Sequence, residues 1–112
     1  MISVGISEGF HDASLALIKD QEILYASHSE RYTQKKNDRW VCQDQWFGVD
    51  WYDNLAFYEN YFWKNTRNFW SLQPQVKYKR EYTHIFRHHE THAAAGYYTS
   101  PFNECNVIVI DS

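Results

Sequence analysis

Short apolar runs separated by polar turns organise the first 30 residues of the chain. The runs are rich in small and β-branched side chains, which is the pattern of strands joined by tight turns. Polar turns at residues 7–9 and 19–22 separate them. Ser29 then stands where it can cap a short helix at residues 30–32. The pattern predicts an antiparallel meander of three strands, at residues 2–7, 13–18 and 23–28.

Between residues 40 and 73 the pattern becomes helical. Large apolar side chains recur at intervals of four, three, four and seven, which places them on one face of a helix. Pro74 ends the segment because proline cannot continue a helix. We predict an aromatic helical insertion over residues 40–73, with a stripe made by Trp51, Leu55, Tyr58, Phe62 and Phe69.

The last third of the chain alternates between strand and helix patterns. Residues 82–87 predict a fourth strand, and an alanine-rich helix over about residues 89–98 follows it and stops before Ser100-Pro101. Residues 106–110 are apolar throughout, which predicts a fifth strand that is central in a sheet.

This order of elements predicts an α/β fold. A three-stranded meander followed by helix, strand, helix and strand is the order of an RNase H-like or actin-like lobe, with a mixed sheet of about five strands and helices packed on it. A chain of 112 residues is one domain at most. We therefore expect residues 1–112 to form a single lobe, without a second lobe to close a cleft.

Composition narrows the classes of function. The net charge of −3, from 11 basic and 14 acidic residues, and the lack of a basic stripe argue against nucleic-acid binding. Cys42 and Cys105 form no CxxC pair and are expected as free thiols. No apolar run is long enough to span a bilayer, and the first residues lack the basic start of a signal peptide. These features predict a soluble cytoplasmic protein with no membrane partner.

Two histidines carry the candidate chemistry. Side chains four positions apart on a helix lie roughly 5–6 Å apart at Cβ, so His88 and His92 can bind one metal ion. Asp111 follows the apolar run at 106–110, where a strand end would present its carboxylate as a third ligand. Three protein ligands leave positions open for substrate, as in a catalytic site. The other interpretation is two surface or capping histidines and an ordinary carboxylate. The ligand types suit iron, zinc and manganese alike.

Several short motifs occur in an order that one enzyme family shares. They are GIS at 5–7, FHDAS at 10–14, ERYTQKKND at 30–38, HHETHAA at 88–94, SPF at 100–102 and VID at 109–111. Together they resemble the N-terminal part of the carbamoyltransferase family that includes nodulation and antibiotic O-carbamoyltransferases. The likeness covers most of the chain, with a gap between Trp40 and Arg80.

The resemblance implies an activity and a set of roles. In such enzymes one domain makes carbamoyl adenylate from carbamoyl phosphate and ATP. An actin-like domain holding a metal ion, usually iron, then passes the carbamoyl group to a hydroxyl. Carried over by motif, the metal ligands are His88, His92 and Asp111. His11 matches a histidine beside the reacting centre, where a neutral imidazole accepts the proton of the attacking hydroxyl. Lys36 matches a cation near the carbamoyl or phosphate group.

The other candidate residues can also be explained without a catalytic role. His11 can shape its turn with Asp12 through local hydrogen bonds, and Lys36 can be an ordinary solvated lysine. His89 faces away from the histidine pair, so we expect it to be structural or to support a ligand.

The resemblance further implies a partial domain that belongs to a larger enzyme. The family continues past its aspartate with a glycine and a Gly-Glu pair, whereas Ser112 follows Asp111 here. We expect a missing C-terminal lobe or a companion chain as partner, and a small-molecule hydroxyl acceptor as substrate. Two alternatives stay open. One is a non-catalytic remnant or metal-binding module of the same fold. The other is a lobe like that of tRNA threonylcarbamoyl transferases, against which the HDAS and ERYTQKK segments argue. The many large rings also predict an exposed apolar patch.

Overall fold

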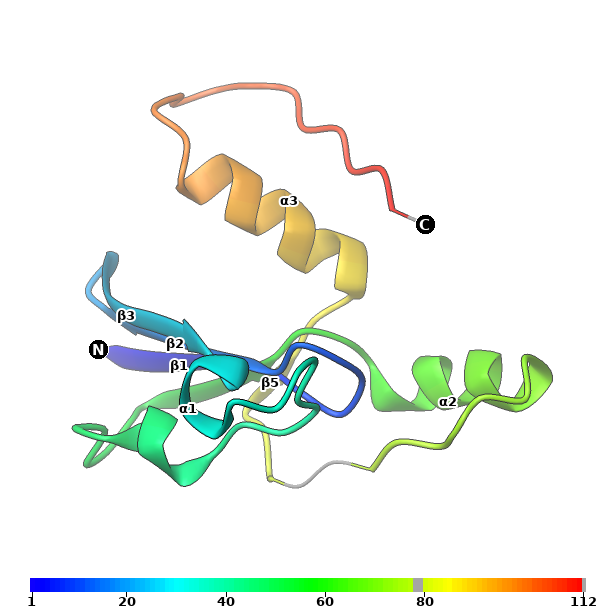
Figure 1. Ribbon diagram of the computed structural model, residues 1–112. Coiled ribbons are helices and arrows are strands. Elements are labelled where there is room, and N and C mark those ends of the chain that lie inside the picture. The colour runs from blue at the N-terminus through cyan, green and yellow to red at the C-terminus, as the bar shows by residue number, and fades with distance from the viewer. Residues whose placement is uncertain (78–79, 112) are drawn as a thin grey trace.

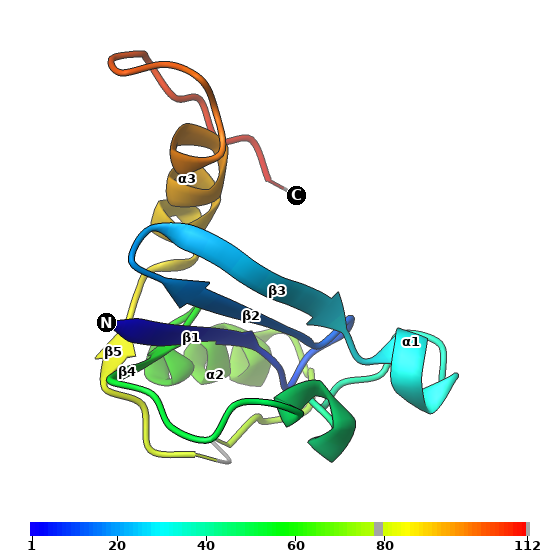
Figure 2. The same cartoon turned by 90° about the vertical axis from the view of Figure 1, so that its left-hand side faces the viewer.

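The computed structural model describes residues 1–77 and 80–111 and has an α/β fold built on one mixed sheet. Its strands are β1 (Ile2–Ser7), β2 (Ser14–Lys19), β3 (Glu22–His28), β4 (Asn54–Phe57) and β5 (His84–Ile85). They lie in the order β3-β2-β1-β4-β5 (Figures 1 and 2). The first three pair antiparallel, whereas β4 is parallel to β1 and β5 is parallel to β4. The predicted fold class, the five-stranded mixed sheet and the N-terminal meander are confirmed.

The core lies on one face of the sheet. Successive residues of a strand point to opposite faces, so alternate positions of β1 and β4 share that face. Val4 pairs in register with Leu55, and Ile6 with Phe57, and all four side chains are buried. Leu15 of β2 joins the same cluster. The buried side chains of β1, β2 and β4 therefore gather on one face of the sheet.

Helical segments connect or follow the strands. They are α1 (Glu30–Thr33), the short 3-10 helix η1 (Gln43–Trp46), α2 (Tyr61–Trp70) and α3 (His88–Tyr98). Figure 1 shows α1 on one side of the sheet and α3 on the other. Asn60 caps α2, because its Oδ1 accepts hydrogen bonds from the N–H groups of Phe62 and Trp63. The helices of residues 1–77 and 80–111 are all too short or too polar to cross a membrane.

The predicted side-chain cap at Ser29 is wrong. Ser29 precedes α1, but its hydroxyl makes no hydrogen bond to the helix. It donates instead to Gln45 Oε1 at 2.6 Å, and both residues are fully buried. A buried amide oxygen needs a donor more than a one-turn helix needs a cap, because water cannot replace the lost partner.

The helical insertion predicted over residues 40–73 is wrong in its first half. Residues 54–57 form β4, and α2 begins only at Tyr61. Leu55 and Phe57 alternate with smaller residues, so a strand buries both of them beside β1. A short apolar run fits either period, and the open edge of β1 decides in favour of the strand. The helical part exposes large rings: Phe62, Trp63, Phe69 and Trp70.

The strands predicted near the C-terminus change as well. The strand expected at 82–87 shrinks to the two residues of β5. The segment 106–110 is irregular and has no strand partner among the described residues. Ile108 and Ile110 are 82% and 91% exposed. An apolar run becomes a central strand only where neighbours on both sides supply hydrogen bonds, and this segment runs back along α3, away from the sheet (Figure 1).

Candidate metal centre

The first turn of α3 presents two histidines on one face. The helix begins at His88, since Arg87 is still extended at φ −81° and ψ 144°. Glu90 reaches back and accepts the Arg87 N–H at 3.1 Å. The Thr91 hydroxyl donates to the His88 carbonyl oxygen at 2.6 Å. With the turn fixed in this way, the His88 and His92 rings lie 4.6 Å apart at their centroids.

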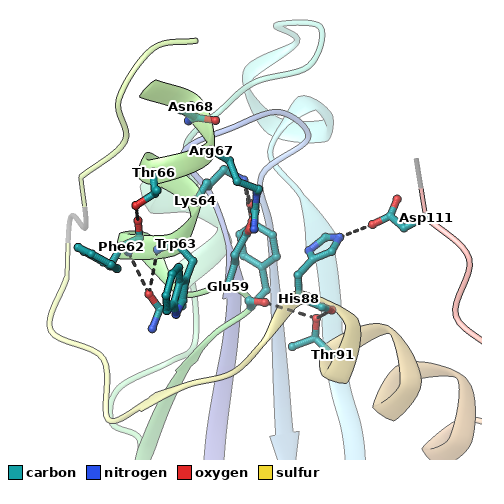
Figure 3. Close-up of polar contacts among 12 residues, drawn as sticks. Glu59, Phe62, Trp63, Lys64, Thr66, Arg67, Asn68, His88, Thr91 and Asp111 are labelled. Carbon is teal, nitrogen blue, oxygen red and sulfur yellow. Dashed lines mark hydrogen bonds and ion pairs between the residues drawn. The ribbon is translucent and has the colours of Figure 1, made fainter. Parts of the chain in front are cut away.

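Asp111 brings a third possible ligand atom to the two imidazoles. His88 Nε2 lies 2.5 Å from Asp111 Oδ2 and 3.1 Å from His92 Nε2. His92 Nε2 lies 3.7 Å from the same carboxylate oxygen, and all three ligand atoms are within 4.8 Å of one another. Figure 3 shows the His88 ring and Asp111 pointing toward each other.

This donor set fits a divalent metal ion. Ligand atoms held about 2.1 Å from one ion stand about 3.0 Å apart in octahedral geometry and about 3.4 Å apart in tetrahedral geometry. The three observed separations fall on both sides of those values. Two imidazole nitrogens that face each other need a proton or a cation between them, because their lone pairs repel. Two imidazoles and one carboxylate suit iron, zinc or manganese.

The predicted convergence is therefore observed, but the predicted support for Asp111 is wrong. No strand carries this residue within the described part of the chain; it lies on the irregular segment that follows α3. His88 and Asp111 are about one-third exposed and His92 about one-half. The Asp111 carboxylate thus approaches the histidines from an irregular segment that is not part of the sheet.

A cavity of about 960 Å³ lies beside the three ligands. His11 lines it, and its Nδ1 lies 2.7 Å from Asp12 Oδ2. His11 therefore lines the same cavity as the three candidate ligands and also makes the local turn contact, and its catalytic role stays a prediction. Lys36 is exposed and does not belong to the described lining, so its predicted role stays a prediction without a contact. His89 lines the cavity next to His88, with ring centroids 5.6 Å apart.

Another part of the cavity wall carries a charged cluster that the sequence analysis missed. Glu59, directly after Tyr58, is buried and accepts hydrogen bonds from Lys64 Nζ, at 2.8 Å, and from Arg67 Nη2 (Figure 3). Lys64 Nζ also donates to the Tyr58 hydroxyl at 2.8 Å. Lys64 and Arg67 stand three positions apart on α2, and this pair of cations on one helical face was the only sign of the cluster in the sequence. Such pairs usually lie on a solvated face, and only tertiary structure brings a buried carboxylate to them.

Burial and pairing act in opposite directions on this cluster. Burial on its own raises the pKa of Glu59, but the hydrogen bond and charge of Lys64, and then those of Arg67, hold that pKa below its ordinary value. Burial raises the pKa of the Tyr58 hydroxyl. At neutral pH Glu59 is therefore ionised and Tyr58 keeps its proton.

Comparison with known proteins gives relatives but no family. No family model matches the chain. Uncharacterized protein MJ1051 of Methanocaldococcus jannaschii is 31% identical over 115 residues, and uncharacterized protein sll1178 of Synechocystis sp. is 25% identical over 153 residues. Each match covers 96% of this chain, but only 21% and 25% of the respective relatives. The chain thus spans a quarter or less of the curated relatives it matches.

Proposed function

We propose that this chain is the metal-binding lobe of an O-carbamoyltransferase. The observation that supports this most is the convergence of His88, His92 and Asp111 beside a cavity that His11 also lines. The family resemblance supplies the reaction, in which a carbamoyl group passes from carbamoyl adenylate to the hydroxyl of a small-molecule acceptor. Carbamoyl phosphate and ATP are the co-substrates, and the reaction takes place in the cytoplasm.

The chain's own residues divide the work in this proposal. Asp12 accepts the Nδ1–H of His11, because a carboxylate can only accept. That contact leaves His11 Nε2 with its lone pair, ready to take the proton of an attacking hydroxyl. His88, His92 and Asp111 hold a divalent ion, with iron expected from the resemblance and zinc or manganese also compatible. Such an ion, held by these three residues, would act as a Lewis acid and as an anchor for the adenylate. In the complete enzyme a second lobe or a companion chain would complete the nucleotide site, whereas the carbamoyl end of the adenylate would be bound by the residues of this chain.

A metal titration with matched variants tests the first half of the proposal. Calorimetry with Zn²⁺, and with Fe²⁺ under anaerobic conditions, should give one ion per chain. His92→Ala should weaken binding at least about tenfold, since a ligand is lost. His84→Ala removes an exposed histidine of β5 that does not line the cavity and should bind as the wild type does. Equal titrations for wild type and His92→Ala would leave only a structural histidine pair.

A ligand titration tests the carbamoyl half separately. The metal-loaded chain is titrated with a sulfamate analogue of carbamoyl adenylate and, in parallel, with AMP. Tighter binding of the analogue, weakened in His11→Ala, is the expected result. If the chain binds metal but does not prefer the analogue over AMP, the non-catalytic metal-binding module is the better description.

A further inference from the structure

Tyr58 touches both polar clusters of the cavity wall. Its hydroxyl accepts a hydrogen bond from Lys64 Nζ at 2.8 Å. Its ring meets the His88 ring edge to face, with centroids 5.7 Å apart and planes at 70°. The Thr91 hydroxyl oxygen, whose proton goes to the His88 carbonyl, lies 3.5 Å from the Tyr58 carbonyl oxygen. Tyr58 therefore connects α2 to the first turn of α3.

The His88 ring lacks the contact that usually orients a metal-binding imidazole. A histidine that binds through one ring nitrogen ordinarily donates its other N–H to a carboxylate, a carbonyl or water, and this sets the ring plane. His88 Nε2 faces Asp111, whereas Nδ1 is buried and has no hydrogen-bond partner within the described residues. Packing has to orient the ring instead. His89 and His92 belong to the same helix, so within residues 1–77 and 80–111 it is Tyr58 that contributes a ring contact to His88 from outside α3.

The Lys64 ammonium group that donates to Tyr58 is fixed by an ion pair with Glu59. The Lys64 side chain is 10% exposed, and a buried ammonium is unfavourable unless it is paired. Glu59 supplies the pairing through Oε2, while its Oε1 accepts from Arg67. Because one ammonium lies 2.8 Å from both the carboxylate and the phenol oxygen, the ion pair fixes the place of the Tyr58 ring.

We propose that Tyr58 is a positioning residue for the metal ligand His88, and that Lys64 locks Tyr58 in place through its hydroxyl. This inference rests on the proposed function in naming His88 a ligand. The competing explanation is purely structural: the Lys64–Glu59 pair only pins α2 to the end of β4. In that case Arg67, which binds the other oxygen of the same carboxylate, should matter to His88 as much as Lys64 does.

The first test follows the His88 ring without any metal. Aromatic proton resonances of His88 are assigned in the chelator-treated full chain and compared in Tyr58→Leu, Tyr58→Phe, Lys64→Met and Arg67→Gln. We expect the largest shift changes in Tyr58→Leu, which removes the ring. Smaller changes that resemble each other are expected in Tyr58→Phe and Lys64→Met, and none in Arg67→Gln. Equal changes in Lys64→Met and Arg67→Gln, or no change in Tyr58→Leu, would overturn the positioning role.

The second test measures the consequence for metal binding. Co²⁺ is titrated into the same variants, and both its affinity and its visible absorption spectrum are recorded. Tyr58→Phe and Lys64→Met should each weaken binding about three- to tenfold, below the range for a lost direct hydrogen-bond partner. The double variant should be no weaker than either single variant, because both remove one interaction. Tyr58→Phe keeps the Lys64–Glu59 pair, so the test stands even if Lys64→Met does not fold.

The two proposals fail in different ways. A wild-type chain that binds no Co²⁺ removes the proposed metal lobe and the ligand role of His88 with it. A chain that binds Co²⁺ with an affinity and a spectrum unchanged by Tyr58→Phe and Lys64→Met overturns the positioning role alone and leaves the metal lobe intact.

Discussion

Two polar clusters line the same cavity and are held together in different ways. In the cluster of Glu59, Lys64 and Arg67, a buried carboxylate meets two cations from the following helix. In the cluster of His88, His92 and Asp111, all three members offer acceptor atoms and all are partly exposed. In the first cluster the chain itself pairs the two buried charges, Glu59 and Lys64, and the exposed Arg67 adds a second cation. In the second cluster two imidazoles and a carboxylate converge, which is the arrangement that a metal ion could occupy.

The segments that carry the two clusters also differ in how well they are buried. Glu59 and Lys64 lie five positions apart, across the start of α2, and both are buried. Asp111 lies on an irregular segment, and α3 itself has no buried residue. The ligand cluster is therefore the more easily rearranged of the two, as expected of a site that exchanges its contents.

Removing the charge of Glu59 should have the largest effect on stability. Glu59→Gln leaves Lys64 buried without its carboxylate, which is expected to cost about 3–5 kcal/mol. Urea unfolding at neutral pH measures this loss. Glu22→Gln, on an exposed position of β3, is the matched control and should change the free energy of unfolding by less than about 0.5 kcal/mol. If the two variants unfold alike, the buried cluster is not what holds α2.

Metal should stabilise the fold through the other cluster. At a free Zn²⁺ concentration about a hundred times its Kd, linkage adds about 2.7 kcal/mol to the free energy of unfolding. Asp111→Asn should lose most of this gain, whereas Arg67→Gln should keep it. The readout is the urea midpoint with and without Zn²⁺. A gain that survives Asp111→Asn would place the ion somewhere else.

The buried cluster should respond to pH only under acidic conditions. The pKa of Glu59 is held below the ordinary glutamate value of about 4.3. Its contribution to stability is therefore complete above that value and is lost only as the pH falls further, through the lowered pKa. Urea midpoints of the wild type and of Glu59→Gln should differ at neutral pH and converge once the pH has fallen through that pKa; a difference that stays constant down to acidic pH would contradict the pairing.

The smallest effect on stability is expected on the exposed face of α2. Trp70 is 79% exposed, so Trp70→Ser should change the free energy of unfolding by less than about 0.5 kcal/mol. It should nevertheless reduce aggregation and dye binding, because an exposed ring is removed from an apolar patch. Trp46 packs against the core, and Trp46→Ser is the control that should lose stability. Light scattering and dye fluorescence give the comparison.

What the sequence predicted correctly came from local periodicity. The alternation in residues 2–28 predicts the meander, and the spacing of His88 and His92 predicts their shared helical face. Both depend on neighbours along the chain. Leu55 was placed in a helix because its spacing to Tyr58 and Phe62 fits one, and only the free edge of β1 makes its segment a strand.

The rest of the site depends on contacts that no local pattern contains. Asp111 was placed near the histidines for a reason that proved wrong, since no strand carries it within the described residues. Glu59 was missed because its two cations reach it from across a helix cap, and Tyr58 was taken as part of an apolar stripe. Which charged side chains meet on the cavity wall is decided by tertiary structure, so the sequence alone does not reveal these contacts.

A Zn²⁺ titration of the wild-type chain and of Asp111→Asn tests the shared cation most directly. The two histidines lie on one helix, whereas this carboxylate comes from a separate segment. The wild type should bind one ion per chain, and the variant should bind at least about tenfold more weakly. Superimposable titrations would show that the three side chains do not share a metal ion.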